Sequence, residues 1–490
     1  MESIVTTIDL LEAPALLVGQ LAALGFSIFT AGYALLHKRH PRSAAIWVVL
    51  CLVLPVLGAI AFWLFGFNRV QTQAQVLRKR WRMEPAPPQD KPFADVPDSD
   101  LDPIPERFRE SSGIGYRVTG RPLLAGNRVR MLRDGDEAYP VMLAAIRGAV
   151  QSISLSTYIF DRDKVGIEFV AALGDAVDRG VDVRVLIDGL GEWYSPRRIG
   201  TLLVQRGIAV ERFLAPSILP PSLHINLRYH RKLLLVDQTV GFTGGMNIGQ
   251  RHMVAGRGRG RGTRDLHFEV RGPILAEMQV TFSEDWSFVC GTGGVAARPI
   301  SIEACGTGPA YVRAINTGPN QDLENLRWIL LASLSRAKQS IRIMTPYFIA
   351  EPSLVAALNA AALRGVEVTL ILPVHNNLTY MTWAARSQLW QLLEFGVRVF
   401  EQAGVFSHTK LVLIDDDYAV IGSSNLDPRS LRLNFEFNLE VCGGDCPAEL
   451  KRHFETALEE SAALELEHLE GRPIWMRLRD AFAALFSPYL

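Results

Sequence analysis

The first 67 residues contain two uncharged, apolar stretches, 13–36 and 44–67. Each reaches the ~20 residues that a helix needs to cross a bilayer. A cleaved signal peptide would have a basic start and a shorter apolar core, whereas acidic residues precede the first stretch here. A buried core helix is the other alternative. Two such stretches in tandem, joined by a short basic turn, favour a transmembrane helical hairpin after a tail at 1–12.

The segment that follows the second stretch changes composition twice. Basic residues come first, and the region from Met83 to Glu110 is rich in Pro, Asp and Glu, so 68–112 is expected to be a linker. A hairpin places both of its ends on one side of the membrane. The basic residues after the second stretch favour a cytoplasmic main body, although the basic turn between the two stretches leaves only a small difference in charge.

The pattern of the remaining chain occurs twice. Residues 149–160 and 337–348 each join an amphipathic helix to a β-branched strand, and a further helix, a glycine and an apolar strand follow each of them, ending in 179–187 and 364–372. A glycine between a helix and an apolar run is typical of an α/β unit. The shared order, spacing and residue identities indicate a duplication.

The predicted fold class is therefore α/β, with two similar halves at 113–298 and 319–490 and a linker at 299–318. Two related halves tend to pair about a pseudo-two-fold axis, and a site on that axis takes equivalent residues from each half. We expect this body to follow the transmembrane hairpin.

Composition excludes several classes of protein. The formal net charge of the 490 residues is zero, whereas a nucleic-acid-binding protein normally shows a basic surface, so no nucleic-acid partner is expected. Five cysteines do not make a disulfide framework in a chain of this length. Cys442 and Cys446 lack a second His/Cys pair at zinc-like spacing, so free cysteines are the better interpretation and no metal is expected.

Each half carries the same polar cluster, which reads H-x-K-x4-D-x6-G-[GS]-x-N. In a strand, His and Lys at i and i+2 point to the same face and reach one pocket, and the following Gly position allows a tight turn that aims the Asn back at it. Two copies with identical spacing argue against chance. The members are His230, Lys232, Asp237 and Asn247 in the first half, and His408, Lys410, Asp415 and Asn425 in the second.

This paired motif resembles that of the phospholipase D superfamily, and the chain is most similar to the bacterial cardiolipin synthase branch. The resemblance covers nearly the whole chain and implies two phospholipase D-like halves behind a multi-pass anchor in the bacterial inner membrane. The stretches that carry it besides the motifs are 54–58, 65–66, 226–232, 345–348, 425–430, 434–438 and 487–490.

The resemblance implies a reaction that joins two phosphatidylglycerol molecules and releases glycerol through a phosphohistidine intermediate. It assigns His230 as the nucleophile and His408 as the general acid and base, and the reverse assignment stays open. No cofactor is implied, because two lysines supply the positive charge that a metal would otherwise bring. The side chains expected to bind the phosphoryl oxygens are Lys232, Lys410, Asn247 and Asn425.

Two further carboxylates are candidates for orienting the histidines. Alignment of 264–270 with 435–441 pairs Asp265 with Glu436, and in the family a carboxylate at the Glu436 position binds the motif histidine. We expect each carboxylate to orient one histidine, and a carboxylate on a solvated strand is the alternative. Asp237 and Asp415 belong to the motif, but their expected role is structural.

Motifs of this superfamily predict the reaction type and not the substrate. A hydrolase, a transferase with another lipid or alcohol acceptor, a nuclease and a non-catalytic membrane scaffold are the alternatives. The apolar hairpin favours a lipid, and two intact motifs argue against a scaffold. The run Gly256–Gly262 is either a flexible surface loop or a basic loop on anionic head groups. The amphipathic segment Trp475–Phe486 either packs on the body or lies on the membrane. The sequence does not indicate an oligomeric state.

Overall fold

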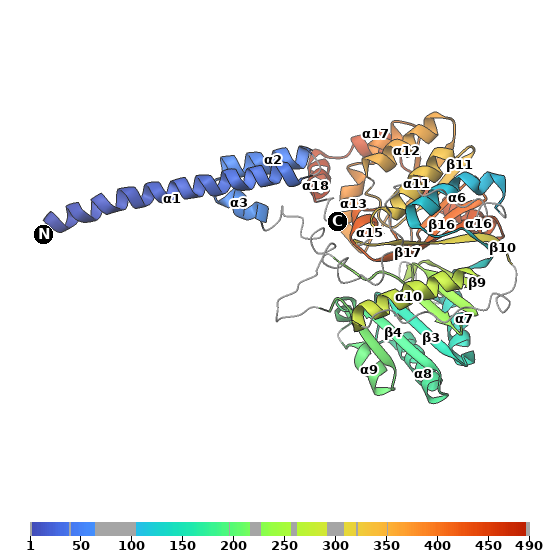
Figure 1. Ribbon diagram of the computed structural model, residues 1–490. Coiled ribbons are helices and arrows are strands. Elements are labelled where there is room, and N and C mark those ends of the chain that lie inside the picture. Colours follow the sequence, from blue (N-terminus) through green and yellow to red (C-terminus); the bar gives the residue numbers. More distant parts are fainter. Residues whose placement is uncertain are drawn as a thin grey trace. The chain divides into compact units, whose positions relative to one another are not determined.

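The chain divides into two compact units, Met1–Val76 and Leu77–Leu490. Each unit is described by itself below, and their elements are labelled in Figure 1. The computed structural model describes residues 2–38, 41–63, 104–195, 197–215, 227–255, 262–291, 308–319, 322–349 and 351–486.

The described part of the first unit has one helix that is long and apolar enough to cross a bilayer. This helix, α1, runs Glu2–His37, and its apolar part is Val18–His37. The second predicted span is not one continuous helix, because α2 (Pro41–Val53) ends before Pro55 and α3 (Leu57–Ala61) follows the break. Pro55 has no amide hydrogen and its ring clashes with the preceding turn, which explains the interruption.

Polar side chains of α1 accept hydrogen bonds from the broken segment, which packs beside it. The Val56 amide, whose residue has a φ of 69°, donates to Ser27 Oγ over 3.0 Å. Nε1 of Trp63 donates to Thr30 Oγ1 over 3.2 Å. An unpaired amide is costly in an apolar solvent, so these bonds stabilise the break where the helix ladder is lost.

Two mixed β-sheets form the body, and their seven equivalent strands have the same order and the same directions. In each half four antiparallel pairs lead into two parallel pairs, as the duplication predicts. The first sheet has the order β2 (Arg128–Arg133), β9 (Leu266–Arg271), β7 (Val240–Gly244), β6 (Leu233–Val236), β3 (Ser152–Thr157), β4 (Asp182–Asp188), β5 (Ala209–Phe213). The second has the order β1 (Leu124–Gly126), β10 (Gly308–Thr317), β17 (Glu436–Cys442), β16 (Tyr418–Gly422), β15 (Leu411–Ile414), β11 (Ser340–Met344), β12 (Glu367–Pro373), β13 (Arg398–Gln402), β18 (Ser461–Ala463).

The chain enters the body through the second sheet. Helix α6 (Glu106–Thr119) crosses the boundary expected at Gly113 and packs on α11 of the second half. Strand β1 then pairs with β10, and only after Asn127 does the chain join the first sheet through β2. The N-terminal part of the first half therefore belongs structurally to the second.

Helices cover the outer face of each sheet, and two helices lie between the sheets. The inner helices are α10 and α16, each of which contacts both sheets, and a single apolar core with residues from both halves surrounds them. Separate apolar cores lie under the outer helices of the two halves. The helices of the first half are α7 (Asp134–Gly148), α8 (Lys164–Asp178), α9 (Ile199–Gln205) and α10 (Ile274–Cys290), with short turns η2 (Gly191–Tyr194) and η3 (Gln250–His252). Those of the second are α11 (Asn325–Arg336), α12 (Pro352–Leu363), α13 (Thr379–Arg386), α14 (Trp390–Leu393), α15 (Pro428–Arg432), α16 (Cys446–Glu459), α17 (Leu466–Glu470) and α18 (Ile474–Ala484).

Candidate active site

Each motif histidine lies just before a short strand that is buried on both faces, β6 or β15. The backbone of the other half holds it there. The amide of His230 donates to the carbonyl of Phe435 over 2.8 Å, and that of His408 donates to the carbonyl of Arg264 over 2.7 Å. The flanking residues pair across the halves as well: strand β14 (Phe406–Ser407) pairs with β8 (Thr263–Arg264) beside His408, and Tyr229 pairs with Phe435 beside His230.

Each histidine also meets a carboxylate from the other half. Nδ1 of His230 lies 2.7 Å from Glu436 Oε2, and Nδ1 of His408 lies 2.7 Å from Asp265 Oδ2. Both carboxylates are fully buried, whereas 12% of each histidine side chain is exposed. A carboxylate on Nδ1 sets the tautomer that leaves Nε2 for chemistry.

The motif lysines lie beside the histidines. Nζ of Lys232 donates to the carbonyl of His230 over 2.7 Å. Nζ of Lys410 donates to the carbonyl of His408 and lies 2.7 Å from Nδ1 of the same residue, and 3.9 Å from Asp265 Oδ2. The four side chains form one electrostatic cluster, because each histidine feels the charge of both lysines.

Burial dominates the electrostatics of the cluster. It lowers the pKa of Lys232 to about 7 and that of Lys410 to about 8. It also lowers the pKa of His230, where Glu436 opposes the effect, and the pKa of His408, where the neighbouring cations add to it. Both histidines are therefore neutral near neutral pH, the state in which an imidazole nitrogen is a nucleophile or a base.

The two histidine–carboxylate pairs are not identical. Glu436 accepts hydrogen bonds from Ser423 Oγ over 2.5 Å and from Asn434 Nδ2 over 3.0 Å. Burial raises the pKa of a carboxyl, but His230, Lys232 and Ser423 outweigh it and hold the pKa of Glu436 below its usual value. Gly245 is the residue of the first half that is equivalent to Ser423. A Cβ added to Gly245 would lie 2.3 Å from Asp265 Oδ1. Burial raises the pKa of Asp265 despite Lys410.

The motif aspartates lie at the far ends of the strands. Asp237 follows β6, roughly 15 Å from Lys232 at ~3.3 Å per residue, and its carboxylate accepts the amides of 150, 151 and 152 over 2.7–2.8 Å. Asp415 accepts those of 338, 339 and 340 over 2.7–3.0 Å. Each aspartate thus ties its strand to the loop before β3 or β11.

The two motif asparagines are buried, and their contacts differ. Asn247 Oδ1 accepts the amide of Ile159 over 3.1 Å, which leaves its Nδ2 as the donor. Asn425 Oδ1 is buried without a hydrogen-bond partner among the described residues.

Two tyrosines that sequence reasoning had not singled out line the histidines. The ring of Tyr158 lies 5.0 Å from that of His230, and the ring of Tyr347 lies 6.3 Å from that of His408. Each follows a repeated threonine, Thr157 or Thr345, that closes the same local turn. The sequence feature that could have identified these tyrosines is an aromatic residue shortly after the threonine in both repeats.

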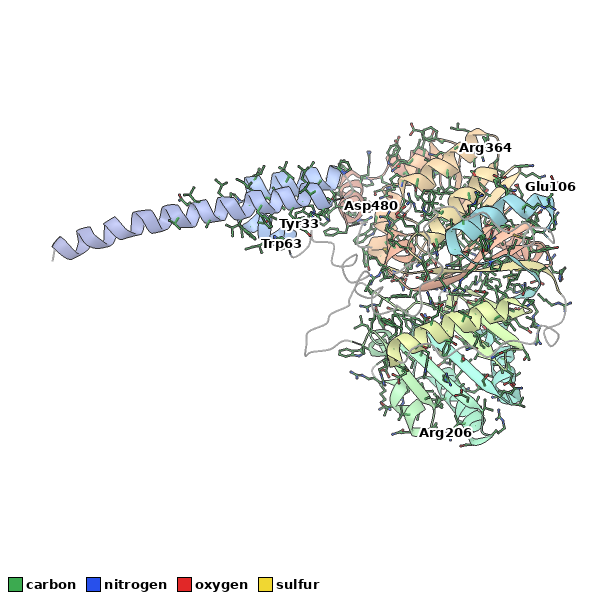
Figure 2. The ribbon with its side chains drawn as sticks, viewed as in Figure 1. Tyr33, Trp63, Glu106, Arg206, Arg364 and Asp480 are labelled. Carbon is green, nitrogen blue, oxygen red and sulfur yellow. The ribbon has the colours of Figure 1, made fainter. Side chains whose placement is uncertain are left out.

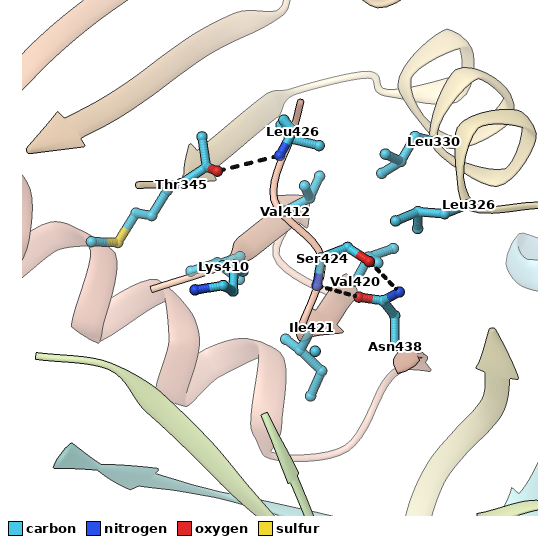
Figure 3. A pocket seen from close by; sticks show the side chains of 13 residues that line it. Leu326, Leu330, Thr345, Lys410, Val412, Val420, Ile421, Ser424, Leu426 and Asn438 are labelled. Atoms are coloured by element: carbon cyan, nitrogen blue, oxygen red, sulfur yellow. Dashed lines mark hydrogen bonds between the residues drawn. The ribbon is translucent and has the colours of Figure 1, made fainter. Parts of the chain in front are cut away.

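A small cavity of about 20 Å³ lies against Lys410 in the second half (Figure 3). Its walls are mostly aliphatic, and Ser424 and Asn438 pair with each other by two hydrogen bonds at its edge.

Some predicted features lie outside the described residues. These are most of the Gly256–Gly262 run, Asn226, the linker 68–103, Phe65–Gly66, Cys305 and the C-terminal Ser487–Leu490. Cys442 and Cys446 are buried free thiols. Within the described part of the chain no three His, Cys, Asp or Glu side chains come together as metal ligands.

Comparisons with known proteins agree with this geometry. The family described as cardiolipin synthase, PLD-like domain, matches residues 142–286 and 330–458, and the phospholipase D-nuclease N-terminal family matches residues 25–66. The chain is 31% identical over 460 residues to a cardiolipin synthase of Halalkalibacterium halodurans, covering 93% of this chain and 90% of the relative. It is 30% identical over 461 residues to cardiolipin synthase 2 of Bacillus cereus, with 93% and 88% covered.

A solved structure shares the fold. The phosphatidylserine synthase of Haemophilus influenzae superposes with a TM-score of 0.60 at 16% identity, covering 78% of this chain and 100% of that one. Fold and motifs together define a phospholipase D-type phosphatidyltransferase. The chain belongs to the cardiolipin synthase family, and it has the cardiolipin synthase activity of that family.

Proposed function

We propose that the chain transfers a phosphatidyl group between two phosphatidylglycerol molecules, giving cardiolipin and glycerol. The observation that carries the proposal is the pair of His–Lys units in one cluster, each with a buried carboxylate from the other half on the Nδ1 of its histidine. One unit supplies a nucleophile and the other a proton donor, as a two-step exchange requires.

In the first step Nε2 of His230 attacks the phosphorus of the donor lipid, and the bond from phosphorus to the glycerol oxygen breaks. The negative charge of the bound phosphate raises the pKa of His408, which then carries a proton on Nε2 and gives it to that oxygen, and glycerol leaves. In the second step His408 takes the proton of a primary hydroxyl of the second lipid. The hydroxyl oxygen bonds to phosphorus, the P–N bond breaks, and His230 is restored.

The difference between the two carboxylates supports this assignment of roles. Glu436 stays ionised because His230, Lys232 and the Ser423 hydroxyl hold its pKa low, so it stabilises the positive charge that His230 acquires on becoming phosphorylated. Asp265 has no such side-chain hydroxyl at the Gly245 position. A carboxylate without that hydroxyl donor suits a histidine that alternately gives and takes a proton.

The remaining motif residues bind the phosphoryl oxygens in this proposal. An approaching phosphate restores the positive charge of Lys232 and Lys410, whose pKa values burial has lowered. Nδ2 of Asn247 and of Asn425 donates to the same oxygens. Asp237 and Asp415 remain structural.

The membrane segment serves as an anchor beside the substrate. We infer a hairpin in which α1 and the broken second segment both cross an inner membrane, with the body on the cytoplasmic side. The support is the apolar length of α1 and the hydrogen bonds that satisfy the break at Pro55.

The test uses the purified chain in detergent–lipid micelles with phosphatidylglycerol as the sole lipid and a chelator present, and it follows products by mass spectrometry. Cardiolipin and glycerol in equal amounts, lost in His230→Ala and in His408→Ala, is the expected result. Phosphatidic acid without cardiolipin would identify a hydrolase. No consumption of phosphatidylglycerol would overturn the proposal.

A further inference from the structure

Helix α18 presents a stripe of large apolar side chains to solvent. At ~100° per residue these positions fall within an arc of about 120° on one side of the helix. Scattered apolar residues are normal on a protein surface, but a contiguous apolar stripe marks an interaction site. Each member is between 49% and 72% exposed: Ile474, Trp475, Leu478, Phe482, Leu485 and Phe486.

The opposite side of α18 packs on α13 of the body, and local ion pairs lie beside that contact. Asp480, labelled in Figure 2, is fully buried and pairs with Arg472 and Arg479 at 2.6 and 2.7 Å. The guanidinium of Arg479 lies 4.4 Å from the ring centroid of Trp383 in α13. The stripe is therefore held outwards by a docked helix.

Helix α18 is connected to the catalytic cluster through α13. Ala483 of α18 shares an apolar cluster with Met381 of α13 and with Tyr347. The Tyr347 ring in turn lies 6.3 Å from that of His408. The helix that carries the stripe is thus linked through Tyr347 to the second motif histidine.

The first half offers a matching element near its own histidine. Trp193 and Tyr194 in η2 are 55% and 62% exposed. The hydroxyl of Tyr194 lies 3.4 Å from that of Tyr158, whose ring lies 5.0 Å from that of His230. Each histidine is therefore linked through one tyrosine to an exposed aromatic element.

We propose that the α18 stripe together with Trp193 and Tyr194, here called the aromatic rim, rests on the surface of an anionic lipid bilayer. Arg477 and Arg479 flank the stripe on its two sides in the same helical projection. Apolar and aromatic side chains between flanking arginines are the arrangement of a helix that lies in the membrane interface. The rim thereby directs both histidines at the head groups.

This inference goes beyond the reaction and the anchor. A tether through α1 keeps the body near the bilayer, but it does not orient the histidine cluster. The rim supplies that orientation. A protein partner or a second copy of the chain would not need the arginines on both flanks.

The first experiment compares one variant on two forms of the same lipid. The full chain is reconstituted in nanodiscs that contain phosphatidylglycerol, and it is also assayed with a short-chain phosphatidylglycerol that stays monomeric in solution. The double variant Leu478→Ser/Phe482→Ser is expected to lose about tenfold in turnover on the bilayer lipid and to keep its turnover on the monomer. The control is Leu363→Ser, at a 70% exposed position in α12, which should change neither.

The second experiment does not need turnover, so its result stands whether or not phosphatidylglycerol is the substrate. Lipids with brominated acyl chains are added to the nanodiscs, and the fluorescence of Trp475 is obtained as the difference between the native chain and Trp475→Phe. Strong quenching by bromine, with weak quenching by aqueous iodide, is expected.

Three outcomes would overturn the inference. Trp475 quenched by iodide alone would place the stripe in water. Trp475 shielded from both quenchers would show a protein cover, such as a second copy. An equal loss on both forms of the lipid would mean that α18 only supports α13 and Tyr347.

Discussion

Nδ1 of His230 lies 2.7 Å from Oε2 of Glu436, a residue 206 positions later in the chain and in the other half. The mirror contact joins His408 to Asp265 across 143 positions. Each half therefore provides a histidine for one unit and a carboxylate for the other. Chemistry at either histidine depends on both halves.

Replacement of Glu436 by Gln should lower turnover by about 10²–10⁴-fold, because the amide cannot stabilise a charged His230. Gln has nearly the same shape, so the fold should persist. Single-turnover assays with phosphatidylglycerol would measure formation of the covalent intermediate and its transfer separately. We expect the larger effect on formation in Glu436→Gln and a smaller one in Asp265→Asn. Full activity of Glu436→Gln would remove the residue from the mechanism.

Lys232 should weaken the fold at low pH. Burial lowers its pKa to about 7, whereas the unfolded chain titrates near ~10.4. Between these two pKa values the unfolded state binds more protons than the folded state, so this group makes the free energy of unfolding rise with pH. Below about pH 7 the buried lysine is charged in the folded state, and the full cost of that charge is present. Lys232→Met should therefore raise the melting temperature more at about pH 6 than at about pH 9, while abolishing transfer. A gain independent of pH would contradict this reasoning.

Gly245 and Ser423 occupy equivalent positions, and substitution should cost more activity at Gly245 than at Ser423. In Gly245→Ala the new Cβ would lie 2.3 Å from Asp265 Oδ1 and push the carboxylate away from His408. We expect a loss of about 10²-fold in turnover. The matched variant Ser423→Gly removes the hydroxyl that donates to Glu436 and accepts the amide of Phe437, and it should cost roughly tenfold. Steady-state kinetics on the two purified proteins would compare them, and equal losses would refute the assignment.

Asp415 should matter for stability and not for chemistry. Its carboxylate accepts three backbone amides at the start of β11. Asp415→Ala should lower the free energy of unfolding by about 1–3 kcal/mol, seen as a lower melting temperature in detergent, with turnover per folded molecule retained. Asp415→Asn keeps one acceptor oxygen and should lie in between. An inactive but stable Asp415→Ala protein would show a catalytic role.

The duplicated sheets were predictable because helix and strand periodicity repeats with the same motif in each half. The positions of Asp265 and Glu436 beside the histidines were expected from the family resemblance at Glu436, which the alignment of two strands extended to Asp265. Helix α6 packs on the second half and strand β1 joins its sheet. Neither was predictable, since a local pattern does not specify which sheet a strand joins. Pro55 can be read in the sequence, but the apolar stretch 44–67 is long enough for one helix, so a single continuous span was predicted there.

Ser423 was harder to recognise. As part of a Gly–Ser turn it has an ordinary local explanation, and only the fold brings its hydroxyl to Glu436. Tyr158 and Tyr347 stand at different offsets from their threonines, so the alignment of the repeats did not pair them.

The exchange of carboxylates has a consequence for how the enzyme is made. Synthesis proceeds from the N-terminus, so the first half leaves the ribosome while the second is still being translated. His230 then has no carboxylate on Nδ1, and no partner histidine, until residues beyond Glu436 have emerged and β17 has joined its sheet. In the proposed mechanism a nascent chain therefore cannot attack a lipid before its second half has been translated and folded.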